Sequence, residues 1–317
     1  MDIDWIERVL VVGAGTMGHS LSIVFARAGY EVDLVDVKEE ILEKASSLIR
    51  SNLETLRATE MIRSESVRKI LDRIHPSTSL DVGKRADVVV EAISEDPKAK
   101  RKLFHSLFSL CSPRTIFSSN TSYLNIFRIL KTGPLERVLI AHWYAPPHLL
   151  PLVDLVKGPK TSEKTLETFR RLLHKVGKEP VVMKRFIPGY IVNRLQRAIG
   201  REIFHLIDGG YASPEEIDLA VKNSLGIRIP VVGVVQRYDY TGLDHSLRVE
   251  KNPSIRLVSK DKISRTLENL VKKGYLGVKS GKGFYDYSPK TTAEILRERD
   301  IQLIEIMKFM KRGTGDS

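Results

Sequence analysis

The sequence has almost no cysteine: Cys111 is the only one among its 317 residues. A single cysteine cannot form an intramolecular disulfide, which excludes a small secreted scaffold held together by disulfides. Cys111 lies in the segment SLCSPRT without a neighbouring base, so a packing role is favoured over that of a nucleophile. Because the first residues also lack the apolar run of a secretory signal, we expect a cytoplasmic protein.

Long hydrophobic runs and aromatic residues are also scarce. The most apolar stretch, residues 138–156, contains two histidines, an aspartate and three prolines, which excludes a membrane span. The net charge of +12 makes nucleic acid a candidate partner, but the excess is six in residues 1–186 and six in residues 187–317. Aromatic residues are only 7% and are not interleaved with the basic clusters, so we expect no nucleic-acid partner. The charge fits either a solvated surface or the attraction of anionic small molecules.

Apolar runs alternate with helical patterns in the first half of the chain, which is typical of a parallel sheet covered on both faces. The pattern predicts strands at residues 8–12, 31–36, 88–92, 115–118, 138–142, 152–156 and 180–183. It predicts helices at residues 16–28, 98–111 and 163–176, and an inserted helix pair over 39–74. After residue 186 helical spacing dominates. We therefore predict an α/β domain over 1–186 and an all-α domain over 187–317.

The first predicted strand leads directly into a glycine-rich segment and a helix. Its residues are Gly13-Ala14-Gly15-Thr16-Met17-Gly18. In the dinucleotide-binding motif the first glycine permits the tight turn, the second lets a pyrophosphate approach the backbone, and the third allows close helix–strand packing. Asp36 ends the second strand, where its carboxylate can accept hydrogen bonds from the ribose hydroxyls and would repel the 2′-phosphate of NADP. A Rossmann-type domain that binds NAD is predicted, although Lys38 could soften the preference over NADP.

Several further segments occur in the order and approximate spacing of L-3-hydroxyacyl-CoA dehydrogenases. They are SSNTSYL, AHWYAPP, LPLVDLV, PGYIVNRLQ and GVKSGKGFYDY. With the glycine motif they make residues 8–287 resemble this family, whose superfamily includes lambda-crystallin, L-gulonate 3-dehydrogenase and carnitine dehydrogenase. The resemblance implies an NAD-dependent enzyme of fatty-acid metabolism that oxidises a short-chain (S)-3-hydroxyacyl-CoA to the 3-oxo compound. It also implies a homodimer formed through the second domain.

The resemblance assigns roles to four catalytic positions. His142 matches the family's general base, which takes the hydroxyl proton, and an imidazole suits this because it titrates near working pH. Asp154 falls where the family has a glutamate that orients the histidine. Ser122 matches the serine near the reacting oxygen and the nicotinamide, and Asn193 matches the asparagine that helps hold the substrate.

The same resemblance extends to contacts with the cofactor. Glu95, Lys100 and Lys279 fall at NAD-contact positions of the family, and Lys279 lies in its C-terminal loop. The remaining histidines have no carboxylate at a repeating metal-ligand spacing, so we expect no metal site.

Three departures bear on the substrate. Ala145 replaces an asparagine of the family, and Asp154 is one methylene shorter than glutamate. The stretch 52–59 lacks the family's serine and lysine that contact CoA, although Arg50, Arg57 and Arg63 could substitute.

Alternatives therefore stay open. One is a dehydrogenase of a free hydroxy acid of the L-gulonate or carnitine type, and another is a non-catalytic, crystallin-like NADH-binding protein. The sequence does not decide whether Tyr238 and Tyr240 line an acyl pocket or belong to the core. Residues 291–311 predict an additional helix that packs on the body or on a partner subunit.

Overall fold

The computed structural model describes residues 3–254, 257 and 263–313. The chain divides into two units, Met1–Ile191 (unit 1) and Val192–Ser317 (unit 2). The division falls five residues after the position 186 that the sequence suggests.

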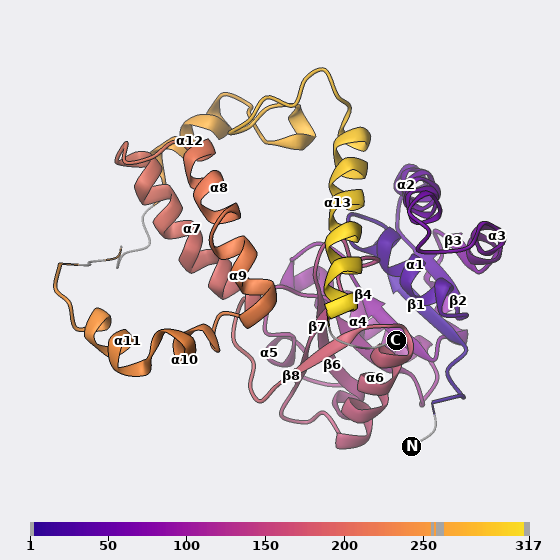
Figure 1. Cartoon of the computed structure of the whole chain (residues 1–317). Coiled ribbons are helices and arrows are strands. Elements are labelled where there is room, and N and C mark those ends of the chain that lie inside the picture. The colour runs from indigo at the N-terminus through magenta and orange to yellow at the C-terminus, as the bar shows by residue number, and fades with distance from the viewer. Residues whose placement is uncertain (1–2, 255–256, 258–262, 314–317) are drawn as a thin grey trace. The chain divides into compact units, whose positions relative to one another are not determined.

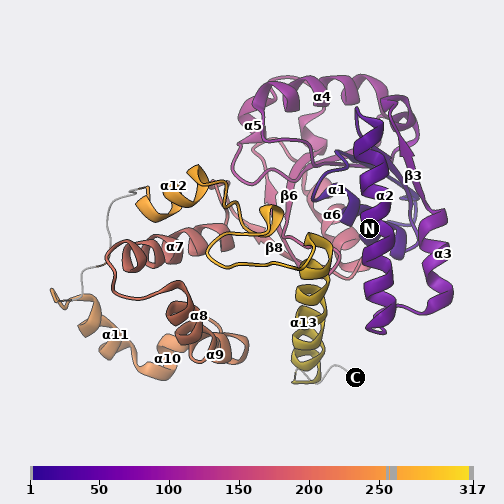
Figure 2. The same cartoon turned by 90° about the horizontal axis from the view of Figure 1, so that it is seen from above.

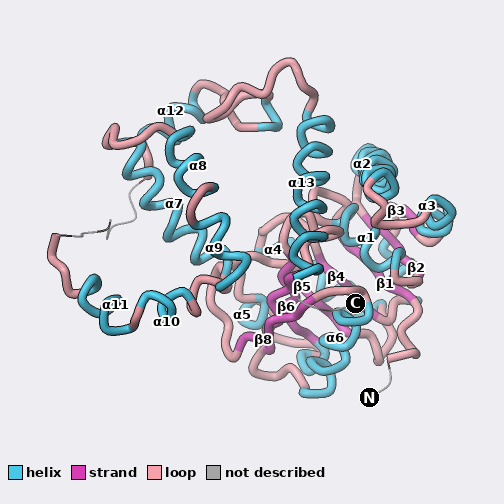
Figure 3. The backbone as a smooth tube through the Cα atoms, in the orientation of Figure 1, coloured by secondary structure: helices cyan, strands magenta, loops and turns pink. Residues whose placement is uncertain are grey.

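Unit 1 is built on one eight-stranded sheet with the strand order β3-β2-β1-β4-β5-β6-β7-β8 (Figures 1 and 3). All neighbours in this sheet are parallel except β6 and β7, which are antiparallel. The strands are β1 (Arg8–Val12), β2 (Glu31–Val35), β3 (Ile74–Ser77), β4 (Val88–Glu91), β5 (Ile116–Ser119), β6 (Val138–Trp143), β7 (Leu152–Lys157) and β8 (Glu179–Met183). The order of the first six strands is that of a Rossmann-type domain.

Helices cover both faces of this sheet. They are α1 (Gly18–Arg27), α2 (Glu39–Ala58), α3 (Ser64–Asp72), η1 (Leu80–Arg85), α4 (Pro97–Leu110), α5 (Ile126–Ile129), η2 (Leu135–Arg137) and α6 (Glu163–Lys175). Figure 2 shows the predicted helix pair, α2 and α3, side by side next to β3. Local signals set the helix starts: Asp96 accepts a hydrogen bond from the Ala99 N–H ahead of α4, and Ser162 accepts one from the Thr165 N–H ahead of α6.

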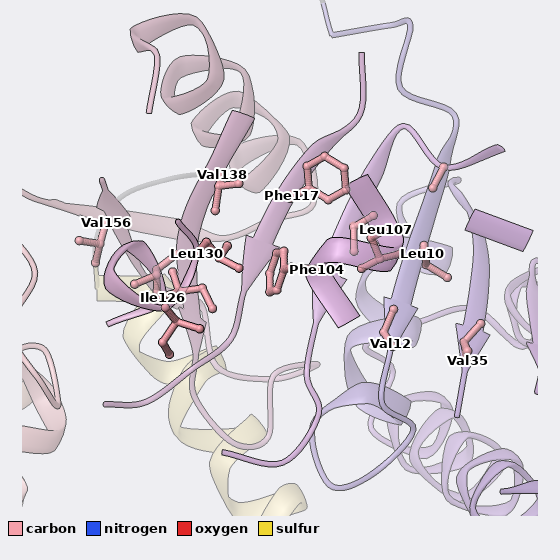
Figure 4. Packing of buried hydrophobic residues seen from close by; sticks show 14 of the residues in the cluster. Leu10, Val12, Val35, Phe104, Leu107, Phe117, Ile126, Leu130, Val138 and Val156 are labelled. Atoms are coloured by element: carbon pink, nitrogen blue, oxygen red, sulfur yellow. The ribbon is translucent and has the colours of Figure 1, made fainter. Parts of the chain in front are cut away.

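The core of unit 1 follows from the alternation of side chains along the buried strands. On β6, Val138 and Ile140 pack into a cluster with Phe104 of α4 and Ile126 of α5, shown in part in Figure 4. Trp143, which faces the opposite side, stacks edge-on against Phe25 of α1 at 5.8 Å between ring centroids. His142 therefore lies on the same face of β6 as the cluster.

The seven predicted strands are confirmed to within one residue at each end, but one strand was missed. β3 has the sequence IHPS, in which Pro76 cannot donate to a ladder. This strand lies at the edge of the sheet, where one side needs no hydrogen-bond partner, so the proline is tolerated. The helix expected from Thr16 begins at Gly18, which leaves Thr16 and Met17 in the preceding turn.

Unit 2 contains helices and, within its described residues, no strand beyond two isolated bridges at Lys282 (Figure 3). Its elements are α7 (Val192–Asp208), α8 (Pro214–Lys222), α9 (Leu225–Val232), α10 (Arg237–Thr241), α11 (Leu243–Glu250), α12 (Arg265–Lys272), η3 (Val278–Ser280) and α13 (Thr292–Gly313). The helix expected at 291–311 is α13. No helix in the described part of the chain combines the length and apolarity needed to cross a membrane.

Candidate active site

The predicted site residues of unit 1 lie at one edge of the sheet. β1, β2, β4, β5 and β6 run in the same direction, so the loops that follow them meet at their carboxyl ends (Figure 1). In open α/β sheets this edge is where ligands bind.

The glycine loop after β1 is held by close packing at two positions and open at the third. Gly13 has a φ of +101°, and a Cβ there would lie 2.6 Å from the Ala92 carbonyl oxygen. A Cβ on Gly18 would lie 1.7 Å from the Gly13 oxygen. Around Gly15, by contrast, a Cβ would meet no atom within 4 Å, and the residue is exposed. The protein's own packing therefore does not require a glycine at 15, and the open space there is compatible with the close approach of a phosphate that the sequence motif predicts.

Asp36 is tied to this loop. Its Oδ2 accepts a hydrogen bond from the Ala14 N–H at 2.8 Å, so the carboxylate lies beside the glycine turn. His19, in the first turn of α1, places Nδ1 2.8 Å from the Gly15 carbonyl oxygen, and burial lowers its pKa. This second contact also braces the loop, and the sequence analysis did not identify it. Thr16 is exposed and Met17 half-buried in the same turn.

Glu95 and Lys100 belong to a largely buried polar network. Glu95 Oε1 accepts hydrogen bonds from the Ser122 N–H at 2.6 Å and the Thr121 hydroxyl at 2.7 Å. Lys100 is buried, with Nζ 2.5 Å from Glu91 Oε1 and 3.3 Å from Glu95 Oε2. Burial raises the pKa of Glu91, although the ammonium of Lys100 opposes that shift. The ammonium of Lys100 thus braces Glu95, which in turn holds the loop that carries Ser122.

His142 and Asp154 are brought together by strand register. They are direct partners in the antiparallel pairing of β6 and β7, and both are buried. His142 Nδ1 lies 3.6 Å from Asp154 Oδ2, and His142 Nε2 lies 3.3 Å from the Ser122 hydroxyl. The shorter aspartate therefore reaches the histidine at ion-pair distance but not at hydrogen-bond distance.

Two tyrosines that the sequence analysis did not single out also contact this pair. Tyr144 donates a hydrogen bond to Asp154 Oδ2 at 2.5 Å. Tyr190 packs its ring at 4.7 Å from the His142 ring and donates to the Thr121 carbonyl oxygen at 2.5 Å. Burial raises the pKa of Tyr190, so its phenol is neutral. Both lie within the motifs given above. The contact of Tyr144 depends on the register of β6 and β7, and that of Tyr190 on packing against a segment distant in sequence.

Asn193 and Lys279 belong to unit 2. Asn193 is half-buried in the first turn of α7, and Lys279 is exposed in η3. Tyr238 and Tyr240 are 41% and 75% exposed, so they are not core residues of unit 2. Burial raises the pKa of Cys111 to about 11, which suits packing rather than nucleophilic attack. In the described ranges no three His, Cys, Asp or Glu side chains cluster as metal ligands would.

Comparisons with known proteins agree over nearly the whole chain. Residues 8–186 match the family model for the 3-hydroxyacyl-CoA dehydrogenase NAD binding domain, and residues 189–287 match that for the C-terminal domain. A probable 3-hydroxybutyryl-CoA dehydrogenase of Bacillus subtilis is 36% identical, covering 90% of this chain and 99% of that protein. A 5-formyl-3-hydroxy-2-methylpyridine 4-carboxylate 5-dehydrogenase of Mesorhizobium japonicum is 28% identical, covering 96% and 99%.

The same activity appears among the solved structures. A crystal structure of a dehydrogenase of this pyridine compound, described as an NAD⁺ dependent dismutase, has a TM-score of 0.86 at 27% identity. It covers 96% of this chain and 99% of its own. The NAD-binding match spans the glycine loop and Asp36, and unit 1 is an NAD-binding domain.

Proposed function

Because the chain belongs to the 3-hydroxyacyl-CoA dehydrogenase family, an NAD-dependent oxidoreductase family, we propose that it oxidises the 3-hydroxyl of a short-chain (S)-3-hydroxyacyl-CoA, with His142 as the general base. The observation that carries this proposal is the buried pairing of His142 with Asp154, with Nε2 directed at Ser122. This pair lies at the same sheet edge as the glycine loop.

The proposed proton transfer follows from the partners of the imidazole. In neutral His142 the proton on Nδ1 points toward Asp154, so Nε2 keeps its lone pair on the side of Ser122. Nε2 takes the proton of the substrate hydroxyl, and Asp154 stabilises the resulting imidazolium. Ser122 donates a hydrogen bond to the reacting oxygen as its charge changes. NAD, when bound, would supply the acceptor for the hydride that leaves the carbon bearing the hydroxyl, so that the product is the 3-oxo compound.

We assign the NAD contacts to residues of both units. The loop 13–18, with Gly13, Gly15, Thr16, Met17 and Gly18, approaches the pyrophosphate, and Asp36 accepts from the ribose. Glu95 and Ser122 are assigned to the nicotinamide end of the cofactor, and Lys100 holds Glu95 in place through their ion pair. Lys279 and Asn193 of unit 2 are proposed as contacts to NAD and substrate respectively, which makes unit 2 the substrate and dimerisation domain.

A basic groove supports a substrate that carries CoA. Arg50, Arg57 and Arg68 line a groove between α2 and α3. Arg57 is paired with Glu54 and Arg68 with Asp72, which also lines the groove, but Arg50 has no ion pair among the residues that the structure describes. A guanidinium without a carboxylate partner suits a phosphate of the nucleotide. Arg63, the third candidate, does not line the groove.

A second candidate is a dehydrogenase of a small carboxylate that carries no CoA. The Mesorhizobium japonicum relative and the solved pyridine dehydrogenase each cover 96% of this chain, whereas the Bacillus subtilis relative covers 90%. Ala145, at the position of a family asparagine, also fits a changed substrate. A free hydroxy acid such as L-gulonate or carnitine belongs to the same class.

The absorbance of NADH at 340 nm separates these candidates. The purified protein is offered (S)-3-hydroxybutyryl-CoA, the free acid, L-gulonate, L-carnitine and 5-formyl-3-hydroxy-2-methylpyridine 4-carboxylate, each with NAD and with NADP. Turnover on the thioester with NAD is the expected result. Turnover only on a compound without CoA contradicts the thioester proposal, and binding of NADH with no turnover on any compound favours a crystallin-like role.

We also propose a homodimer in the cytoplasm. Apolar side chains are exposed along several helices of unit 2, including Leu195 and Ile199 of α7 and Ile227 of α9, which a second copy would cover. The cytoplasmic location is supported by the single cysteine. Sedimentation equilibrium tests the dimer, and a monomer at micromolar concentration contradicts it.

A further inference from the structure

Tyr144 and His142 converge on one carboxylate oxygen. Tyr144, the first residue after β6, donates its hydroxyl proton to Asp154 Oδ2 at 2.5 Å, and the same oxygen lies 3.6 Å from His142 Nδ1. The two rings are edge to face, with centroids 4.7 Å apart and planes at 84°. The tyrosine is therefore packed against the histidine that shares its acceptor.

The imidazole, in contrast, has no partner within hydrogen-bond distance of Nδ1 among the described residues. His142 Nδ1 and Asp154 Oδ1 are both buried, and neither has a hydrogen-bond partner within the described part of the chain. The carboxylate is thus held by the phenol and stands just beyond hydrogen-bond reach of the imidazole. A buried ring nitrogen and a buried carboxylate oxygen that lack hydrogen-bond partners are each energetically costly, so the arrangement needs an explanation.

We infer that Tyr144 is a positioning residue for the proton transfer: by donating to Asp154 Oδ2 it draws the carboxylate and part of its charge away from His142, so that the imidazole remains available as a base. A carboxylate in full contact with Nδ1 would favour the imidazolium and keep Nε2 protonated to higher pH. Tyr144 offsets this pull. The inference rests on the proposed role of His142 as the base.

The other charged groups of unit 1 near His142 do not replace Asp154 in this role. Tyr190, whose ring packs 4.7 Å from the His142 ring, is neutral because burial raises its pKa. Glu95 reaches His142 only through the backbone of Ser122, and its charge is countered by Lys100. Glu91 is paired with the same lysine. Asp154 is therefore the carboxylate in direct contact with the imidazole within this unit.

The main test is the pH profile of kcat/KM for Tyr144→Phe. Without the phenol, the full charge of Asp154 acts on His142, and the midpoint of the acidic limb moves up by about one pH unit, the size expected for one hydrogen bond to a charged group. Below that midpoint the rate falls about tenfold, while the plateau at high pH is nearly retained. A tyrosine that only fills space would lower the rate equally at every pH, and this result would overturn the inference.

Two controls isolate the hydroxyl. Tyr30→Phe removes another buried phenol of unit 1, just before β2 and so at the opposite end of the parallel strands from the glycine loop, and should leave the profile unchanged. In an Asp154→Asn background there is no carboxylate charge to share, so adding Tyr144→Phe should no longer move the limb. A full shift in that background would contradict the role of Asp154.

A second readout does not depend on turnover. Nitrogen-15 histidine spectra of the protein without ligands follow the protonation of each ring, and the His142 signals are those lost in His142→Gln. The titration midpoint of His142 should rise in Tyr144→Phe by the same amount as the kinetic limb. Unshifted spectra overturn the inference even if His142→Gln is inactive. A shifted midpoint combined with full turnover of His142→Gln would instead overturn the proposed function: Tyr144 would still govern the protonation of His142, but His142 would not be the base.

Discussion

The two units bury apolar side chains to very different extents. In unit 1, Leu10 and Phe104 are completely buried, and the sheet and helices enclose a continuous core (Figure 4). In unit 2, α7 has no buried residue, and Leu195 and Ile227 are 47% and 63% exposed. Unit 1 therefore has the buried apolar core that a stable domain needs. The amphipathic helices of unit 2, by contrast, expose apolar faces that soluble proteins usually cover.

The difference extends to the chemistry. The proposed base His142, the neighbouring Asp154 and the glycine loop belong to unit 1, where strand register and buried polar contacts hold them in place. Unit 2 contributes residues whose roles rest on the resemblance alone, such as Asn193 and Lys279. We therefore expect changes in unit 1 to have larger effects than matched changes in unit 2, and substitutions in pairs can test this.

The largest contrast is expected between His142→Gln and Asn193→Ala. Loss of the general base should lower kcat about 10³-fold, within the usual range for such groups, while Asn193→Ala should cost about ten- to a hundredfold. Steady-state kinetics on the preferred substrate measure both, and NADH fluorescence titration checks that cofactor binding is retained. Near-normal turnover of His142→Gln would show that His142 is not the general base.

Stability provides the second contrast. Phe104→Ala should lower the free energy of unfolding by about 3–5 kcal/mol, because it opens a cavity in the core of unit 1. Ile199 is 54% exposed, so Ile199→Ala should cost at most about 0.5 kcal/mol unless a second copy covers it. Urea unfolding at two protein concentrations distinguishes these cases. A concentration-dependent loss in Ile199→Ala supports the dimer, and an equal, concentration-independent loss in both variants would contradict the comparison.

Cofactor binding provides a third pair, Asp36→Ala in unit 1 and Lys279→Ala in unit 2. Asp36→Ala should weaken NAD about tenfold and improve the relative use of NADP, since one hydrogen bond to a charged group is lost and the repulsion of the 2′-phosphate is removed. Lys279 is exposed, and its loss should matter less. Isothermal titration with NADH and NADPH measures both, and an unchanged ratio in Asp36→Ala would place the ribose contact elsewhere.

Sequence patterns predicted the parts of unit 1 that depend on local signals. Its buried strands are apolar runs, and its glycine loop is recognisable from the spacing of Gly13, Gly15 and Gly18. β3 was missed because a proline in a four-residue edge strand resembles a loop. The pairing of Tyr144 with Asp154 and the chain from Lys100 to Ser122 could not be predicted, since both depend on the register of neighbouring strands and on side-chain packing rather than on local sequence signals. In unit 2 the periodicity predicted helices but not how exposed they are.

The smallest expected effect concerns the free-energy cost of burying a charged lysine, Lys178, in unit 1. Lys178 is buried, and its Nζ donates to the Pro147 and Leu150 carbonyl oxygens at 2.7 and 2.9 Å, which ties down the loop after β6. Burial, with a smaller contribution from Arg27, lowers the pKa of Lys178 from 10.5 to about 8. Between these two values the unfolded chain holds a proton that the folded chain has released, so this residue makes the protein more stable as pH rises from 8 to 10.5.

Lys178→Met should remove that dependence. The free energy of unfolding of the parent protein, minus that of the variant, should rise by about 1–3 kcal/mol between pH 8 and 10.5, because other groups titrate equally in both. The two lost hydrogen bonds add an offset that does not change with pH. Urea unfolding at several pH values measures the difference, with the exposed Lys164→Met as the control. If the curves of parent and Lys178→Met are parallel, the charge of Lys178 costs unit 1 nothing, and its core tolerates a buried cation as readily as the surface does.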